Sequence, residues 1–422
     1  MSEKTETGVP AVPVRGGWYR SLQGPAKPAF ISSALGWGLD SFTYMIFPLA
    51  LTAIVAEFGL SGAEAGWAAT ATLVASAIGG AGAGVIADRI GRVRTLMLAV
   101  GLYSLFTFLC GLAPNYPTLM VFRVLLGIGF GGEWAAGALL ISELCNPVYR
   151  GRILGAVAAF WNVGWGTAVL LYSFLFSILP ADVGWRVMFC IGIAPAALVL
   201  YIRRRVPEPS SVAKQRSEER PRSPFFDIFR PGTLRITIFA ALLATGVQGG
   251  NYAIFTWLPA YLKQTRHLTA VGTGSYLAVV IVSGVIGSLV AGSVNDRLGR
   301  RPTFAIFSIG SAALILAYLA IPTGNNLVLL LIGAPLGFFS SGIFAGFGSY
   351  LAELYPVSCR GAGQGFCYNF GRAMGAFFPA LIGYLSATVG LGGAMAFAAA
   401  GYLIALLSLA FLPETKGKLL TV

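Results

Sequence analysis

Long apolar runs alternate with short polar or charged segments over almost the whole chain. Each run is about 19 to 29 residues long, enough for a helix to cross roughly 30 Å of hydrocarbon. A polar stretch rich in Arg, Glu, Ser and Pro, at 204–233, separates six runs from six. These runs predict transmembrane helices over 30–55, 63–86, 95–113, 117–142, 153–179, 185–203, 234–262, 271–294, 302–321, 327–352, 361–387 and 391–412.

The pattern predicts an all-α membrane protein with twelve transmembrane helices in two pseudo-symmetric six-helix bundles. The expected divisions are a tail over 1–29, an N-terminal bundle over 30–203, a linker over 204–233, a C-terminal bundle over 234–412 and a tail over 413–422. A short interfacial helix is expected within the linker, around Phe225–Phe229.

Charged turns between the runs recur in the second half of the chain. The stretch from Gly84 to Arg94 is repeated 208 positions later, from Gly292. Two more pairs keep the same order: Glu143 and Arg150 match Glu353 and Arg360, and Val206-Pro-Glu matches Leu412-Pro-Glu. Offsets of 206 to 210 in one order indicate that the halves are parallel repeats.

Composition agrees with a membrane protein, because 56% of residues are hydrophobic and only 11% are charged. Of 29 Lys and Arg residues, 24 lie in the segments that face one side when both termini are cytoplasmic. This positive-inside bias predicts cytoplasmic termini, and it explains the net charge of +13 without nucleic acid. The polar, Pro-rich segment over 1–28 is no signal peptide, so the first span must direct insertion.

Few side chains are suited to metal binding or covalent catalysis. His267 is the one histidine, and the five cysteines stand singly in or beside apolar runs. We therefore expect no metal, no cofactor and no enzyme activity.

The Gly-x-x-x-Asp-Arg-x-Gly-Arg turns, together with Arg123 in Val-Phe-Arg123-Val-Leu-Leu-Gly-Ile-Gly, resemble the major facilitator superfamily. The surroundings of Asp40, Glu133 and Arg372 resemble organic-acid:proton symporters, of the sialate and lactate type and their metabolite- and aromatic-acid-carrying relatives. The resemblance implies a monomeric carrier in a bacterial inner membrane, working by alternating access between its two bundles.

Within that resemblance, the duplicated charged turns are expected to fasten the two bundles on the cytoplasmic side when the carrier faces outward. A charged residue at a helix end, such as Asp88, can bind basic partners there. The residues expected to act in this gating are Asp88, Arg89, Arg92, Asp296, Arg297, Arg300, Glu143, Arg150, Glu353 and Arg360.

The functional hypotheses rest on ionisable side chains inside the spans, because placing each one in the membrane costs at least about 2.5 kcal/mol. Asp40 lies near mid-depth of the first span and is expected to bind a proton; a permanent pair with an arginine is the alternative. Glu133 is a second candidate acceptor, unless it bonds neighbouring backbone or a tryptophan. The resemblance makes Arg123 a proton-relay or inter-helix anchoring residue.

Arg372, near mid-depth of span eleven, is the candidate anchor for a substrate carboxylate. The alternative is a pair with an acid of the second half, for which Glu353 lies too near the cytoplasmic end. Trp257 and Tyr261 are expected in an aromatic belt at the membrane interface. The other candidate substrate-binding residues are Tyr44, Gln248, Asn251, Tyr252, Tyr368 and Asn369.

The function expected from these residues is uptake of a small organic anion, a carboxylate, together with protons. A proton-driven exporter of amphipathic or anionic compounds is the first alternative, because the same fold and acids can support antiport. A receptor that senses a ligand without moving it is disfavoured by the short tails.

Overall fold

The computed structural model describes residues 17–144, 150–197, 199, 201, 225–322, 324–356 and 359–416, and every regular element in them is helical. The twelve-helix prediction is confirmed. The first half contains α1 (Gly17–Arg20), α2 (Ala26–Phe58), α3 (Gly62–Ile90), α4 (Arg92–Gly111), α5 (Tyr116–Leu144), α6 (Arg150–Ile178) and α7 (Ala181–Ile191).

The second half begins with the short helix expected in the linker. Its elements are η2 (Phe225–Phe229), α10 (Pro231–Gln264), α11 (Ala270–Leu298), α12 (Arg300–Ala320), α13 (Asn326–Gly342), η3 (Ile343–Gly346), α14 (Phe347–Leu354), α15 (Arg360–Gly375), α16 (Phe377–Met395) and α17 (Ala398–Leu409).

Two spans are less regular than their apolar runs suggest, and one helix continues from one span into the next. The sixth run is helical over Ala181–Ile191 and turns afterwards, while the tenth changes from α13 through the 3-10 turn η3 to α14. Gly390 separates spans eleven and twelve within α16, with φ of 72° and ψ of 161°. A residue with a Cβ rarely adopts this φ, which explains the glycine at that boundary.

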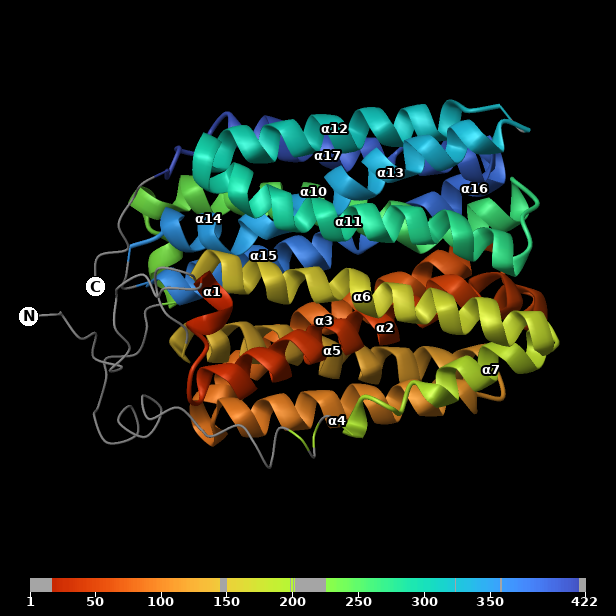
Figure 1. Ribbon diagram of the computed structural model, residues 1–422, viewed down its shortest axis with the longest axis horizontal. Coiled ribbons are helices and arrows are strands. Elements are labelled where there is room, and N and C mark those ends of the chain that lie inside the picture. The colour runs from red at the N-terminus through yellow and green to blue at the C-terminus, as the bar shows by residue number, and fades with distance from the viewer. Residues whose placement is uncertain are drawn as a thin grey trace, which may run out of the picture.

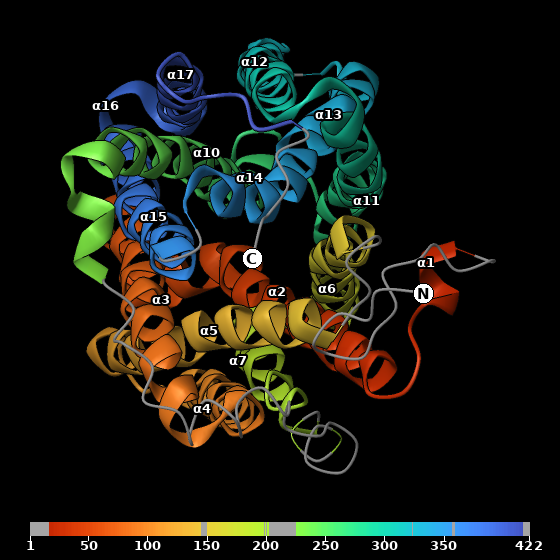
Figure 2. The same cartoon turned by 90° about the vertical axis from the view of Figure 1, so that its left-hand side faces the viewer.

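The two halves lie side by side, and α1, the first described helix, lies at the same end of the molecule as α14 (Figure 1). We call the end that holds Gly17 and Lys416 the terminal end, and the opposite end the distal end. Viewed from the terminal end, α2, α3 and α6 of the first half face α10, α11 and α15 of the second (Figure 2).

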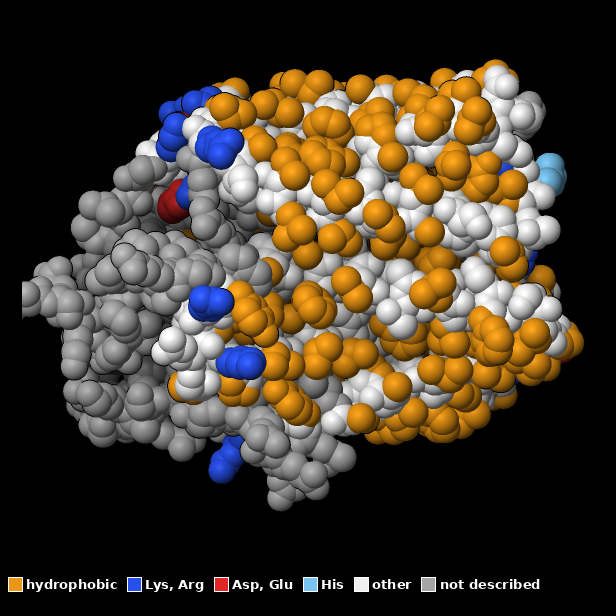
Figure 3. Space-filling view, viewed as in Figure 1, with side chains coloured by type: hydrophobic (Ala, Val, Ile, Leu, Met, Phe, Trp, Pro, Cys, Tyr) orange, Lys and Arg blue, Asp and Glu red, His pale blue; other side chains and the backbone are white. Residues whose placement is uncertain are grey.

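The surface agrees with a membrane-embedded protein. Among the residues that the structure describes, eight helices are long and apolar enough to cross a membrane, and Tyr116–Gly132 and Ala398–Leu409 are shorter apolar helices. Apolar side chains cover the middle of the face in Figure 3, whereas most of its Lys and Arg side chains lie toward the terminal end. Such an apolar band belongs against lipid rather than water.

The duplication seen in the sequence extends to helix packing. A Cβ added at Gly79 of α3 would lie 2.1 Å from the carbonyl oxygen of Ile128 in α5. A Cβ added at Gly287 of α11 would lie 2.1 Å from the carbonyl oxygen of Phe338 in α13. Only glycine lets these helices approach so closely, and both halves use it at matching positions.

The halves meet directly at the distal end. A Cβ on Gly383 of α16 would lie 2.1 Å from the carbonyl oxygen of Gly62 in α3, and one on Gly66 would lie 2.7 Å from the carbonyl oxygen of Pro379. The Thr70 hydroxyl donates a hydrogen bond of 2.6 Å to the Ala376 carbonyl across the same junction. These contacts close the junction between α3 and α16 at the distal end.

Candidate substrate site between the two halves

Arg372 of α15 lies buried where the halves face each other, with 1% of its surface exposed. Its guanidinium carbon is 5.4 Å from the ring centre of Phe130 in α5 and 5.2 Å from that of Tyr368. Among the described residues, its Nε and Nη1 have no hydrogen-bond acceptor. A buried cation with unused donors is suited to hold an anion.

Four aromatic side chains lie together near Arg372, and we call them the aromatic cluster. Tyr44 of α2 stacks on Phe130 with ring centres 5.7 Å apart, and Tyr252 of α10 lies 6.0 Å from Tyr44. Trp161 of α6 lies 6.1 Å from Tyr44 and 6.3 Å from Phe130. The cluster therefore draws one ring from each of four helices, three in the first half and one in the second.

Hydrogen bonds connect the side chains of the second half that lie next to the aromatic cluster. The Tyr252 hydroxyl donates to Gln248 Oε1 at 3.2 Å, and Gln248 Nε2 donates to the Tyr368 carbonyl at 2.9 Å. The ring centre of Tyr368 lies 5.2 Å from the guanidinium carbon of Arg372. Gln248 thus joins Tyr252 of α10 to the helix that carries Tyr368 and Arg372.

Asp40 is fully buried on α2, one helical turn from Tyr44. Its negative charge acts favourably on the Arg372 guanidinium, which lies in the other half. The Asp40 carboxylate is suited to bind a proton, and the Arg372 guanidinium is suited to bind a substrate anion. Tyr44 also reaches across this junction, because its hydroxyl lies 3.4 Å from Thr256 Oγ1 of α10.

Two predicted substrate-binding residues are engaged elsewhere. Asn251 Nδ2 donates to the Ser340 carbonyl of α13 at 3.1 Å. Asn369 Nδ2 donates to the Gly365 carbonyl at 3.0 Å, and its Oδ1 lies against Gly80 of α3. The structure therefore brings together Asp40, Tyr44, Tyr252, Tyr368 and Arg372, with Gln248 behind them.

Arg123 of α5 joins three helices of the first half. Its Nε donates to the Ala68 carbonyl of α3 at 3.0 Å, and its guanidinium carbon is 3.6 Å from the ring centre of Phe47 in α2. This geometry is that of an inter-helix anchor. The Glu133 side chain lies outside the described residues, as do those of Asp88, Arg89, Arg92, Glu143, Arg150 and Asp296.

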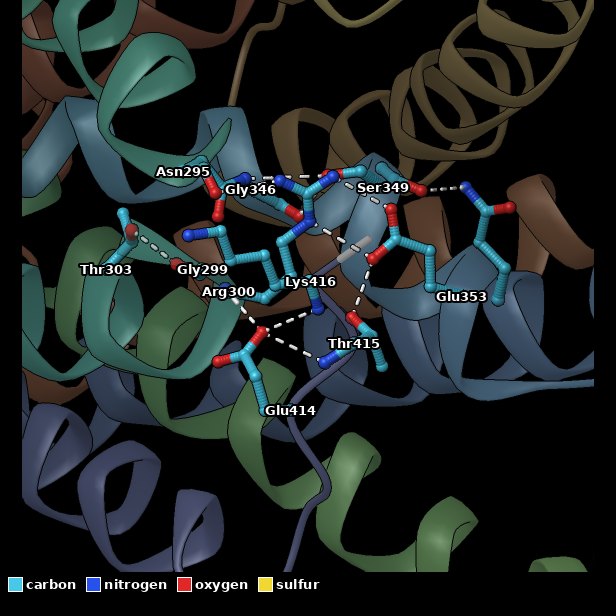
Figure 4. Close-up of polar contacts among 12 residues, drawn as sticks. Asn295, Gly299, Arg300, Thr303, Gly346, Ser349, Glu353, Glu414, Thr415 and Lys416 are labelled. Carbon is cyan, nitrogen blue, oxygen red and sulfur yellow. Dashed lines mark hydrogen bonds and ion pairs between the residues drawn. The ribbon is translucent and has the colours of Figure 1, made fainter. Parts of the chain in front are cut away.

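Two of the described gating candidates, Arg300 and Glu353, belong to a network at the terminal end of the second half (Figure 4). Arg300 donates to both carboxylate oxygens of Glu353, from Nε at 3.1 Å and from Nη2 at 2.9 Å. Thr415 Oγ1 donates to Glu353 Oε2 at 2.6 Å. Glu353 is therefore bound here and not to Arg372. Arg360 is half-buried, whereas Arg297 is exposed and its carbonyl accepts a hydrogen bond from Lys416.

Glu414 binds the start of α12 in the same network. Its carboxylate accepts backbone N–H groups of Arg300 and Arg301 at 2.8 and 2.9 Å. The backbone N–H groups of Thr415 and Lys416 add two more hydrogen bonds, each of 2.9 Å. Burial acts to raise the pKa of Glu414, but the four backbone donors outweigh it and hold the pKa below its usual value.

Sequence reasoning missed part of the site and misplaced two aromatic residues. Phe130 lies in an apolar run where nothing marks it as functional, and Trp161 stood out only for the polar Asn162 beside it. The interfacial belt assigned to Trp257 and Tyr261 is wrong, because both are buried. Trp257 Nε1 donates to the Pro379 carbonyl at 3.0 Å, and the Tyr261 hydroxyl accepts from Arg266 Nε at 3.0 Å.

Comparison with known proteins identifies the family of this chain. The chain matches the Major Facilitator Superfamily over residues 29–292 and 274–421. It is 38% identical to a protein of Cupriavidus pinatubonensis described as a probable 4-methylmuconolactone transporter, covering 95% of this chain and 93% of that one. It is 33% identical to the cis,cis-muconate transport protein of Acinetobacter baylyi, covering 87% and 89%.

Among solved structures, the xylose transporter of E. coli in a partially occluded, inward-open conformation has the same fold. Its TM-score is 0.74 at 19% identity, covering 94% of this chain and all of that one. The family match spans nearly the whole chain, and the relatives named above are transporters rather than enzymes. The chain belongs to the Major Facilitator Superfamily.

Proposed function

We propose that the protein is a secondary transporter that takes up a small organic carboxylate together with protons. The observation that carries the proposal is Arg372, a buried guanidinium with unused donors beside the aromatic cluster and within electrostatic reach of Asp40. A carboxylate would bind the free N–H groups of Arg372, while its apolar part packs on the rings of Tyr44, Phe130 and Trp161.

The aromatic cluster favours a flat, unsaturated substrate over a bulky polar one. Ring faces give stacking contacts to a planar conjugated group but few hydrogen bonds to hydroxyls. Two relatives at 38% and 33% identity are named for muconolactone and muconate, which are unsaturated acids or their lactones. We therefore place planar unsaturated carboxylates first among the candidate substrates.

Proton coupling follows from the charges in the site. In this proposal, the Asp40 carboxylate supplies the negative charge that offsets Arg372 when no substrate is bound. When a substrate carboxylate binds Arg372, one negative charge becomes surplus in a region of low dielectric, and protonation of Asp40 removes it. The loaded carrier can then reorient without carrying an unbalanced buried charge. Glu133 is the second candidate proton acceptor, and Arg123 anchors the helices around the site.

The proposed orientation places the terminal end in the cytoplasm of a bacterial cell, with a single chain as the working unit. The closed distal end then faces outward, and the described state opens inward. Space on the terminal side of the site agrees with this, because a Cβ added at Gly365, two turns from Arg372 on α15, would meet no atom within 4 Å. The charged turns, with Asp88 first, would fasten the terminal end in the opposite state.

Purified protein in proteoliposomes loaded with a pH-sensitive dye tests the proposal. We expect internal acidification when cis,cis-muconate or an aromatic acid is added outside, and smaller responses to lactate and sialate. Protein-free liposomes correct for passive entry of the protonated acids. The symporter proposal would be lost if no acid moved protons while a lipophilic compound did, since that result identifies an exporter.

A further inference from the structure

A four-residue pattern of aromatic, Asn, apolar and Gly residues occurs once in each half. In α6 it reads Trp161-Asn162-Val163-Gly164, and in α15 it reads Tyr368-Asn369-Phe370-Gly371. The copies are 207 positions apart, which matches the 206 to 210 of the other repeats. The two patterns therefore occupy equivalent places in spans five and eleven.

Successive residues on a helix point about 100° apart, so four of them face four directions. The aromatic residue faces the candidate site, because Trp161 contacts Tyr44 and Tyr368 contacts Arg372. The apolar residue faces outward: Val163 is 50% exposed and Phe370 is 41% exposed.

The glycine faces the first helix of its own half. A Cβ on Gly164 would lie 1.7 Å from the Gly38 carbonyl oxygen of α2. A Cβ on Gly371 would lie 2.5 Å from the Ala244 Cβ of α10. Both spans are therefore held tightly against their own bundle at the level of the site.

The asparagine reaches across to the other half. Asn162 is 1% exposed, and its Oδ1 accepts a hydrogen bond of 3.2 Å from Ser341 of α13. The same oxygen lies 2.8 Å from where a Cβ on Gly284 of α11 would be. In the other copy, Asn369 Oδ1 lies 2.7 Å from the corresponding point on Gly80 of α3. Each half thus places one amide against a glycine of its partner.

We propose that Asn162 and Asn369 are positioning residues that couple the substrate site to the rocking of the halves. Each asparagine and its aromatic neighbour share one helical turn, which moves as a unit because its backbone is rigid and its glycine is wedged against the bundle. A substrate that shifts Trp161 or Tyr368 therefore shifts the contact between the halves. The proposal rests on the alternating access of the proposed function, but not on the identity of the substrate.

The direction and the size of the expected shift between the two conformations follow from this contact. The hydrogen bond of Asn162 joins the halves in the described state, in which α3 and α16 meet at the distal end, so it favours that state over one that is open at the distal end. Removing the hydrogen bond of Asn162 should raise the population open at the distal end about fivefold, the shift expected for one buried hydrogen bond.

Hydrogen exchange of the substrate-free, full-length protein in lipid nanodiscs tests this. In Asn162→Ala, amides of 62–66 and 383–386, at the distal junction, should exchange about fivefold faster than in the parent. Gly284→Ala should act in the same direction, because its methyl group displaces Asn162 while alanine favours the helix. Val163→Ala is the matched control, since it lies next to Asn162 but faces outward, and should leave these rates unchanged.

Faster exchange confined to the turn around residue 162, or equal effects in Val163→Ala, would overturn the coupling. A transport assay with cis,cis-muconate then separates positioning from binding: Asn369→Ala should lower the maximal rate about fivefold with KM within twofold. A KM that rises in step with the loss of rate would instead make Asn369 a substrate ligand. Because hydrogen exchange needs no substrate, its outcome stands even if muconate is not transported.

Discussion

Arg372→Lys is the sharpest test of the proposed substrate site, because it retains a positive charge at that position and changes the donor geometry. Arginine presents five N–H donors in a planar fork, whereas lysine presents a compact ammonium on a flexible stem. Two nitrogens of Arg372, Nε and Nη1, are without acceptors among the described residues and are available to a ligand.

The size of the effect follows from those donors. A hydrogen bond between charged partners contributes about 1.5–3 kcal/mol, and about 1.4 kcal/mol corresponds to a factor of ten in affinity. Losing one such bond should raise the KM for a transported carboxylate between about tenfold and about a hundredfold. The loss falls on binding rather than on proton coupling, so the number of protons moved per substrate should stay the same.

Uptake of labelled cis,cis-muconate into proteoliposomes under a fixed pH gradient would measure this KM. The matched control is Arg230→Lys, an arginine with 73% of its side chain exposed in a surface pair with Asp227, for which little change is expected. If Arg372→Lys kept the parent KM within twofold while its uptake was still saturable, Arg372 would not be the carboxylate anchor.

Four further outcomes are expected. Asp40→Asn should abolish accumulation driven by a pH gradient yet retain counterflow of labelled substrate; loss of both would place Asp40 in the substrate contact instead. Phe130→Leu should raise the KM for an unsaturated acid about threefold to tenfold relative to lactate, because an aromatic pair contributes about 0.5–1.5 kcal/mol beyond burial, and an equal effect on both acids would contradict a stacking role. The lowered pKa of Glu414 stabilises the fold above the unfolded value of about 4.3, and that part is lost as pH falls through the folded pKa. Thermal melts should therefore show a Tm that drops on acidification less steeply in Glu414→Gln than in the parent. Asp88→Asn should slow net transport more than it weakens equilibrium binding of substrate, and unchanged turnover would remove the gating role.

The sequence predicts the architecture well because membrane insertion imposes a length and an apolar composition on every span. Buried charges such as Asp40 and Arg372 stand out for the same reason, since each is costly in hydrocarbon. Phe130 has no such signal, because an aromatic side chain in an apolar run looks the same whether it faces lipid, a neighbouring helix or a substrate. Its place in the aromatic cluster follows only from the packing of α2, α5 and α6, which brings Phe130 against Tyr44 and Trp161.

The wrong prediction for Trp257 and Tyr261 and the missed role of Glu414 each have a local structural cause. Depth along span seven suggested an interfacial place for Trp257 and Tyr261, but α16 covers the first and Arg266 binds the second. The role of Glu414 was hidden because its partners are backbone N–H groups of α12, more than a hundred positions earlier in the chain. The repeat that contains Asn162 and Asn369 was available in the sequence, at the offset already seen for the charged turns.

The distal closure described above consists of glycines set against backbone, whereas the described terminal-end network is held by the charges of Arg300, Glu353 and Glu414. Dissolved ions screen contacts between charges but have little effect on steric contacts, and the screening length falls to about 8 Å at physiological ionic strength. The two faces of the membrane should therefore differ in their response to salt. In the proposed orientation, the external medium can vary widely in ionic strength without loosening the contacts at the distal end, while the charged network lies in the compartment whose salt content the cell itself controls.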